Sequence, residues 1–181
     1  MGDSAAMRPV PSAHGAGAGS GYAQVLTAGI SEMVLAERPD QMLATHSLGS
    51  CLGLVAFDPK LGVAGLVHCL LPRARDRKNR PDFNPYMYVD TGVPALVRAL
   101  YAKGAARSRL VFKAAGCAHM MNVSNAFDIG RSNCETLRKL MRANDLKLAA
   151  EDTGGTIPRT LRFHMADMRA EIASIGRRWD L

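Results

Sequence analysis

A cysteine and a histidine in two neighbouring apolar segments are the residues best suited to chemistry in this chain. Cys51 follows a short stretch of small and polar residues, and His68 lies near the end of the next apolar run. A thiol beside an imidazole is the minimal unit of a cysteine nucleophile, because the imidazole can remove the thiol proton and stabilise the thiolate. The pair can do this only if the fold brings the two side chains together.

One predicted β-hairpin would bring them together. Segments 51–57 and 63–70 are short and apolar, as buried strands are, and the residues between them include Asp, Pro and Gly in an order that favours a turn. If the loop has two residues, the register places Cys51 directly opposite His68. A bulge at Gly62 would shift the register by one residue, and the two side chains would remain within about one residue of each other.

The turn that leads into Cys51 is a second reason to expect chemistry. Leu48, Gly49 and Ser50 form a flexible approach to the strand, where backbone N–H groups can remain unpaired and face a reacting oxygen. We therefore expect the amides of Gly49 and Ser50 to contribute to an oxyanion site. The alternative is structural, because a free cysteine is usually buried as a small hydrophobic residue.

The remaining cysteines have simpler interpretations. Cys69 points away from the face of His68 and is predicted to lie in the core. Cys134 falls in the first turn of a predicted helix, which favours a lowered pKa, but burial is the simpler account. Cys117 and His119, together with His68 and Cys69, raise a zinc alternative that lacks the closely spaced cysteine pairs of structural zinc sites. We predict no metal and no cofactor.

The composition is that of an ordinary globular domain. The 181 residues suffice for one core, and 48% hydrophobic with 22% charged residues argues against a disordered chain. Four irregularly spaced cysteines do not form a disulfide framework, and no segment resembles a signal peptide or a membrane span. We expect a cytoplasmic, reduced protein, an environment that suits a reactive thiol.

The net charge of +7 makes nucleic-acid binding a function to consider. The basic residues concentrate in segment 73–80 and near the C-terminus, without a zinc knuckle, an RNA-recognition motif or a recognition-helix pattern. An acidic protein partner, or solubility alone, explains the charge more simply. Segment 73–80 closely follows His68 and is expected to lie near the mouth of the site.

The rest of the chain is interpreted as a tail followed by one domain. Residues 1–22 are rich in Gly, Ala, Ser and Pro and are expected to be a disordered tail, and residues 23–181 form the domain. Apolar spacing predicts helices over about 91–103 and 133–144, the second starting at a capping box at Ser132. Strands outside the hairpin are predicted over 29–36, 41–45, 108–115, 146–151, 160–165 and 169–175. Many strands with only two helices indicate an α+β layered fold.

The order and spacing of these residues resemble the CheD family of chemoreceptor glutamine deamidases. The resemblance rests on Thr45, on the turn through Gly49 and Ser50 to Cys51, and on His68 followed closely by Leu-Pro. Further matching segments follow in the family's order: Tyr88-Val-Asp90, Lys113 before Ala-Gly116, Ile129-Gly130-Arg131-x-Asn133, and Asp152-x-Gly154-Gly155 with Arg159. The resemblance extends from about residue 29 to about residue 175.

The resemblance implies an activity, a site and partners. It implies hydrolytic deamidation of glutamine side chains on methyl-accepting chemotaxis receptors, with Cys51 as nucleophile and His68 as acid and base. Thr45 is implied as a third polar residue that orients His68 or the substrate amide, the alternative being an ordinary strand threonine. The CheC phosphatase is implied as a further partner. The alternative function is an adaptor that binds receptors or CheC without turnover.

The resemblance also implies the architecture. It predicts a layered sandwich of β-sheets with helices packed on one side, similar to the catalytic domain of cytotoxic necrotizing factors.

Overall fold

The computed structural model describes residues 24–119 and 128–181. The predicted tail over residues 1–22 lies outside the described residues, so the division into a tail and a domain stays a prediction. None of the described helices is long and apolar enough to cross a membrane.

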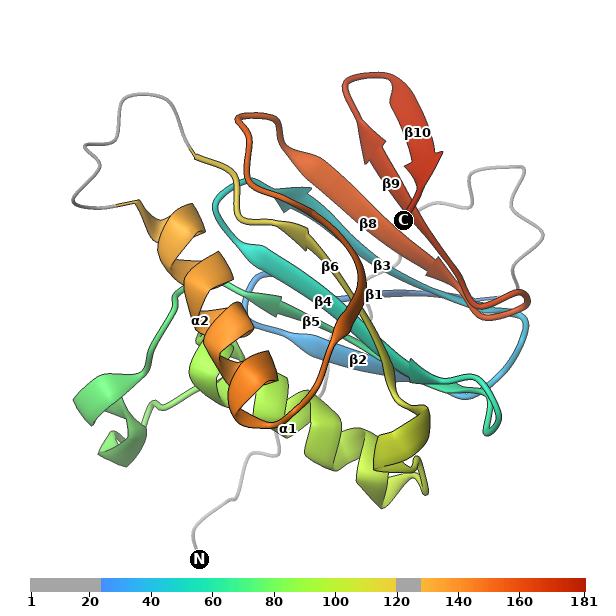
Figure 1. Ribbon diagram of the computed structural model, residues 1–181, viewed down its shortest axis with the longest axis horizontal. Coiled ribbons are helices and arrows are strands. Elements are labelled where there is room, and N and C mark those ends of the chain that lie inside the picture. Colours follow the sequence, from blue (N-terminus) through green and yellow to red (C-terminus); the bar gives the residue numbers. More distant parts are fainter. Residues whose placement is uncertain (1–23, 120–127) are drawn as a thin grey trace, which may run out of the picture.

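Two five-stranded sheets are stacked, and two helices cover the outer face of one of them (Figure 1). The first sheet has the order β1 (Gln24–Thr27), β3 (Gln41–Leu48), β8 (Arg159–His164), β9 (Arg169–Ser174) and β10 (Arg177–Asp180). The second has the order β2 (Met33–Ala36), β5 (Val63–Cys69), β4 (Leu52–Asp58), β6 (Val111–Gly116) and β7 (Leu148–Thr153). The helices are α1 (Val89–Ala102) and α2 (Ile129–Ala143). The predicted α+β layered fold with helices on one side is confirmed, and the likeness to cytotoxic necrotizing factors stays a prediction.

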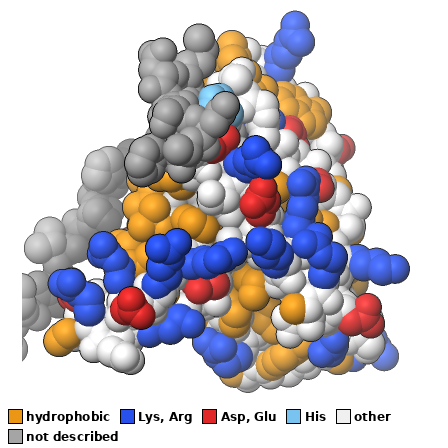
Figure 2. All heavy atoms as spheres, turned by 60° about the vertical axis from the view of Figure 1, so that its left-hand side comes forward, with side chains coloured by type: hydrophobic (Ala, Val, Ile, Leu, Met, Phe, Trp, Pro, Cys, Tyr) orange, Lys and Arg blue, Asp and Glu red, His pale blue; other side chains and the backbone are white. Residues whose placement is uncertain are grey.

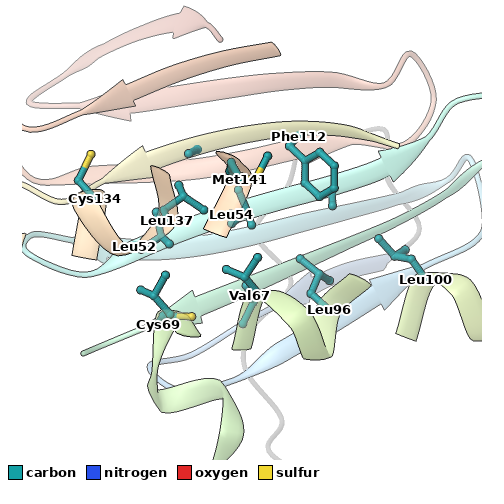
Figure 3. Packing of buried hydrophobic residues seen from close by; sticks show 14 of the residues in the cluster. Leu52, Leu54, Val67, Cys69, Leu96, Leu100, Phe112, Cys134, Leu137 and Met141 are labelled. Atoms are coloured by element: carbon teal, nitrogen blue, oxygen red, sulfur yellow. The ribbon is translucent and has the colours of Figure 1, made fainter. Parts of the chain in front are cut away.

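The central strands of the second sheet are buried on both faces. In β4, Leu52 and Leu54 pack toward the helices, whereas Val55 and Phe57 pack between the two sheets. This alternation follows from the two-residue period of a strand, and it explains why the segment is continuously apolar. Figure 3 shows the helix-side cluster, in which side chains of α1 and α2 meet those of β4 and β5. The two apolar layers hold the second sheet in place from both sides.

The β4–β5 connection differs from the predicted two-residue loop. Asp58 pairs with Val63, so the connection has four residues, and Gly62 adopts a positive φ of 74°. The buried carboxylate of Asp58 accepts hydrogen bonds from the backbone of Lys60 and Leu61 and forms an ion pair with Arg109 (2.7 Å). These partners hold the longer loop in shape, and the Arg109 hydrogen bonds lower the pKa of Asp58 to about 2. The predicted register is therefore wrong by two residues.

Helix α2 begins four residues earlier than predicted. Its N-cap is Asp128, whose carboxylate accepts a hydrogen bond from the Arg131 amide (2.9 Å). The predicted capping box at Ser132 does not form, because Ser132 lies inside the helix, where Glu135 forms an ion pair with Arg131. An aspartate N-cap satisfies the orphan amides as well as serine does. The earlier start places Asn133 inside the helix, on its buried face.

Both edges of the first sheet were missed by the sequence analysis. Strands β1 and β10 lie at these edges, and each is only four residues long. The predicted strand 29–36 is shorter than expected, since only Met33–Ala36 pairs, with β5. The basic segment 73–80 and the residues that follow it contain two short 3-10 helices, Arg75–Asn79 and Pro85–Met87.

Candidate active site

The candidate site lies between the two sheets, where Thr45 and His68 meet. Thr45 is fully buried on β3 of the first sheet, and His68 is 1% exposed on β5 of the second. The Thr45 hydroxyl oxygen lies 2.8 Å from Nδ1 of His68. Just after Thr45, a β-bulge inserts one extra residue into β3, and Ser47 adopts a positive φ of 57°. The bulge lets both Thr45 and Leu48 face inward.

The hydrogen bonds of Thr45 determine the tautomer of His68. The Thr45 hydroxyl also lies 2.8 Å from the carbonyl oxygen of Ala28, which can only accept. The single hydroxyl proton is therefore given to Ala28, and the Thr45 oxygen accepts the Nδ1–H of His68. Nε2 then carries the lone pair, and it is buried with no hydrogen-bond partner among the described residues. His68 thus presents an unoccupied basic nitrogen.

Burial keeps both the thiol and the imidazole uncharged at rest. It lowers the pKa of His68 from 6.5, an effect that Glu32 partly offsets. Burial also raises the pKa of the Cys51 thiol from 9.0, and the backbone N–H of Cys51 opposes this only partly. A neutral thiol with a neutral imidazole is therefore the resting state at neutral pH, and reaction requires proton transfer from sulfur to nitrogen.

Cys51 lies immediately before β4 and is 7% exposed. His68 pairs with Gly53, so the predicted placement of Cys51 directly opposite His68 is wrong, because the connecting loop is longer than expected. Cys51 precedes Gly53 by two residues and extends the ladder, since its carbonyl accepts the Cys117 amide (2.7 Å). A two-residue step returns to the same face of a strand, so Cys51 and His68 are diagonal neighbours on one face.

The backbone N–H groups predicted to stabilise an oxyanion differ in whether they are already hydrogen-bonded. The Gly49 N–H donates to the Ser47 carbonyl (2.9 Å) and is committed to the turn. The Ser50 N–H has no acceptor among the described residues, and the Cys51 N–H lies against its own sulfur. The Ser50 and Cys51 amides, rather than that of Gly49, are thus available to a developing oxyanion.

Two glycines that the sequence analysis left without a role make room for this site. A Cβ on Gly116, whose φ is +99°, would lie 2.3 Å from the carbonyl oxygen of Cys51. A Cβ on Gly53 would lie 2.7 Å from Leu48 and 3.4 Å from Thr45. An isolated glycine inside a strand pattern signals such close approach, and this signal was present in the sequence.

The four residues of the zinc alternative do not converge. Cys69 and Cys117 belong to the helix-side core, whereas His68 faces Thr45 between the sheets. His119 is hydrogen-bonded through Nδ1 to Asp128 (2.9 Å). Within residues 24–119 and 128–181, no three His, Cys, Asp or Glu side chains form a metal-binding group.

Cys134 is buried and has a lowered pKa. It lines a cavity of about 420 Å³ near the start of α2, together with Arg138 and Thr153. A hydrogen bond from the Cys117 thiol, and then the contributions of Thr153 and Arg138, lower the pKa of Cys134 to about 6. This lowered pKa favours the thiolate of Cys134, which lies outside the Thr45–His68 site.

A cysteine, a histidine and a threonine gathered between two sheets can supply the nucleophile, the base and the group that orients the base in an enzyme that works through a thiol. The chain belongs to the CheD family: residues 70–174 match the family described as CheD chemotactic sensory transduction. The matched range begins after His68 and so does not include Thr45, Cys51 or His68.

Curated relatives extend the similarity over most of the chain. A protein of Solibacter usitatus named "Probable chemoreceptor glutamine deamidase CheD" is 40% identical over 153 residues, which are 84% of this chain and 90% of the relative. A protein of Symbiobacterium thermophilum with the same name is 41% identical over 152 residues, 82% of this chain and 92% of the relative. A "CheD 2" protein of Anaeromyxobacter dehalogenans, also named a probable deamidase, is 37% identical over 150 residues, 83% of this chain and 94% of the relative.

Proposed function

We propose that this protein hydrolyses glutamine side chains of chemoreceptors to glutamate and ammonia, with Cys51 as the nucleophile. Membership of the CheD family and the names of the relatives support the reaction and its substrate class. The observation that carries the mechanism is the hydrogen bond between Thr45 and His68, which leaves Nε2 of His68 as an unoccupied base.

In the first half of the reaction, a thioester forms. Nε2 of His68 takes the proton of the Cys51 thiol, and the thiolate attacks the side-chain carbonyl carbon of the glutamine. The oxyanion that develops is stabilised by the Ser50 and Cys51 amides. The His68 imidazolium then protonates the departing nitrogen, which leaves as ammonia while Cys51 remains acylated.

In the second half, water hydrolyses the thioester. His68, neutral again, removes a proton from a water molecule as it attacks the acyl carbon, and the Cys51 sulfur leaves and recovers the proton. Throughout both halves, Thr45 accepts the Nδ1–H of His68, so that Nε2 is the atom that exchanges protons. Thr45 thus orients His68, which is one of the two roles that the sequence analysis left open.

The substrate segment is proposed to be a cytoplasmic receptor helix. The same proposal implies that the protein itself acts in the cytoplasm. An acidic receptor segment would complement segment 73–80, which is basic and follows β5 closely. Figure 2 shows Lys and Arg side chains in a band across the face of the molecule that carries α2 and this loop. Opposite charges accelerate encounter and orient the partners. The CheC phosphatase is proposed as a second partner.

The experiment that tests this proposal is mass spectrometry of a receptor cytoplasmic domain co-expressed with the protein. Specific glutamines should gain the mass that accompanies conversion to glutamate, and co-expression with Cys51→Ala should give no gain. If the wild-type protein binds the receptor but leaves every glutamine unchanged, the adaptor function replaces the enzymatic one. Substantial turnover by Cys51→Ala would contradict the thiol mechanism.

A further inference from the structure

A single buried amide joins the turn that carries Cys51 to the end of the strand that carries His68. Asn133 on α2 is fully buried, and its Nδ2 donates hydrogen bonds to the carbonyl oxygens of Ser50 (2.9 Å) and Leu70 (3.1 Å). Ser50 directly precedes Cys51, and Leu70 follows His68 by two residues. The side chain therefore spans the two backbone segments that position the thiol and the imidazole.

The orientation of the Asn133 amide follows from its partners. Both neighbours are carbonyl oxygens, so only the NH₂ group can face them, and both of its hydrogens are used. The remaining oxygen, Oδ1, is buried and has no hydrogen-bond partner among the described residues. An unpaired buried carbonyl is destabilising, and an apolar side chain of similar size would avoid this cost. Asparagine at this position is thus explained by the two hydrogen bonds and not by packing alone.

The helix that carries Asn133 is itself held against the Cys51 turn. A Cβ on Gly130 would lie 2.3 Å from the carbonyl oxygen of Ala118, so α2 begins in direct contact with this backbone. The Ala118 amide in turn donates to the Gly49 carbonyl (2.8 Å), and the Cys117 amide donates to Cys51. The start of α2 therefore packs directly on the backbone that is bonded to the Cys51 turn, and Asn133 reaches both segments from there.

We infer that Asn133 is a positioning residue, which sets the separation between the Cys51 sulfur and Nε2 of His68. This inference rests on the proposed Cys51–His68 mechanism. Without the two hydrogen bonds, the turn and the end of β5 lose the one side-chain link that supplements the β4–β5 ladder, and we expect the two reacting atoms to move from the separation that proton transfer requires. A displacement of about 1 Å can reduce an enzymatic rate by about a hundredfold.

The test combines deamidation kinetics with the alkylation rate of Cys51. Asn133→Ala should lower kcat by about a hundredfold, the loss expected for a displacement of about 1 Å, with little change in KM. Asn144→Ala is the matched control, because Asn144 ends the same helix and donates to a carbonyl far from the site. It should leave kcat unchanged. Alkylation must be read by peptide mass spectrometry, so that labelling of Cys51 is separated from that of Cys134.

A double-mutant comparison separates positioning from general stability. If Asn133 acts through the Cys51–His68 pair, Asn133→Ala combined with His68→Ala should alkylate at Cys51 no more slowly than His68→Ala alone. The inference would be overturned if the losses of Cys51 alkylation rate in the two single variants simply add in the double variant. An unchanged kcat in folded Asn133→Ala would overturn it as well.

Two further outcomes keep the inference testable. If Asn133→Ala does not fold, Asn133→Leu fills the same space with an apolar side chain that lacks the two hydrogen bonds, and the same loss is expected. If the wild-type protein does not deamidate receptors, a dependence of Cys51 alkylation on both His68 and Asn133 would still support the positioning role, and only the proposed function would fail.

Discussion

The hydroxyl oxygen of Thr45 lies 2.8 Å from Nδ1 of His68, although the two residues belong to different sheets. The Thr45 proton is directed to the Ala28 carbonyl, so the threonine acts as an acceptor toward the imidazole. The stacking of the sheets thereby determines which nitrogen of His68 carries the proton.

Replacing Thr45 should separate the hydrogen bonding of its hydroxyl group from the shape of its side chain. Thr45→Val keeps the shape but leaves the Nδ1–H of His68 and the Ala28 carbonyl unpaired, which costs about 1–3 kcal/mol for each buried group. Deamidation should fall by at least tenfold, whereas Thr45→Ser should retain most of the rate. Rate measurements, with ¹⁵N NMR of the imidazole to report the tautomer, check this expectation. A fully active Thr45→Val would show that His68 does not depend on Thr45.

The pH dependence of kcat/KM should follow the shifted groups. His68 must be unprotonated to accept the thiol proton, and its lowered pKa moves the acid limb to a midpoint below 6.5. Because the pKa of Cys51 is raised from 9.0, the alkaline limb should lie above that value. The rate should therefore be nearly constant through neutral pH. An acid midpoint clearly above 6.5 would contradict a neutral resting imidazole.

Cys134, and not Cys51, should be the thiol that alkylates with a midpoint near pH 6. Its lowered pKa depends first on the Cys117 thiol, so Cys117→Ala should shift this midpoint upward. Site-resolved labelling with iodoacetamide across a pH series measures both midpoints.

Deamidation should be unaffected by Cys134→Ala, because this residue lies outside the Thr45–His68 site. Loss of activity in a well-folded Cys134→Ala or Cys117→Ala protein would mean that the second thiol site contributes to the reaction.

Charge reversal in segment 73–80 tests the proposal that this basic segment binds the receptor. Changing Arg75, Arg77 and Arg80 to Glu should weaken receptor binding at low salt and remove most of its salt dependence. Arg80 pairs with Asp82 in the free protein, so it should contribute less than the other two. Binding measured at several salt concentrations gives the comparison.

Arg177→Glu is the control for this surface, because Arg177 is exposed on the edge strand β10 of the other sheet. It should leave binding unchanged. Unchanged receptor deamidation by the triple reversal at low salt would assign the positive charge to solubility.

Local sequence was sufficient for most of the main elements and for choosing Cys51 and His68 as candidate reactive residues. Segments 51–57 and 63–70 are continuously apolar because their strands are covered on both faces, and this pattern is visible without a structure. The hairpin pattern brought Cys51 and His68 to one site, whereas Thr45 was implied only by the resemblance to the CheD family.

Contacts between residues distant in sequence decided the rest. The hairpin register depends on Asp58, whose loop is held by Arg109, 51 residues away. The link between the Cys51 turn and the end of β5 depends on Asn133, 83 residues after Ser50. Hydrogen-bond geometry and burial exist only in the folded chain, and periodicity and turn propensity carry no information about them. The sequence thus determined which residues could react, and only the tertiary structure decided their register, their protonation and what holds them.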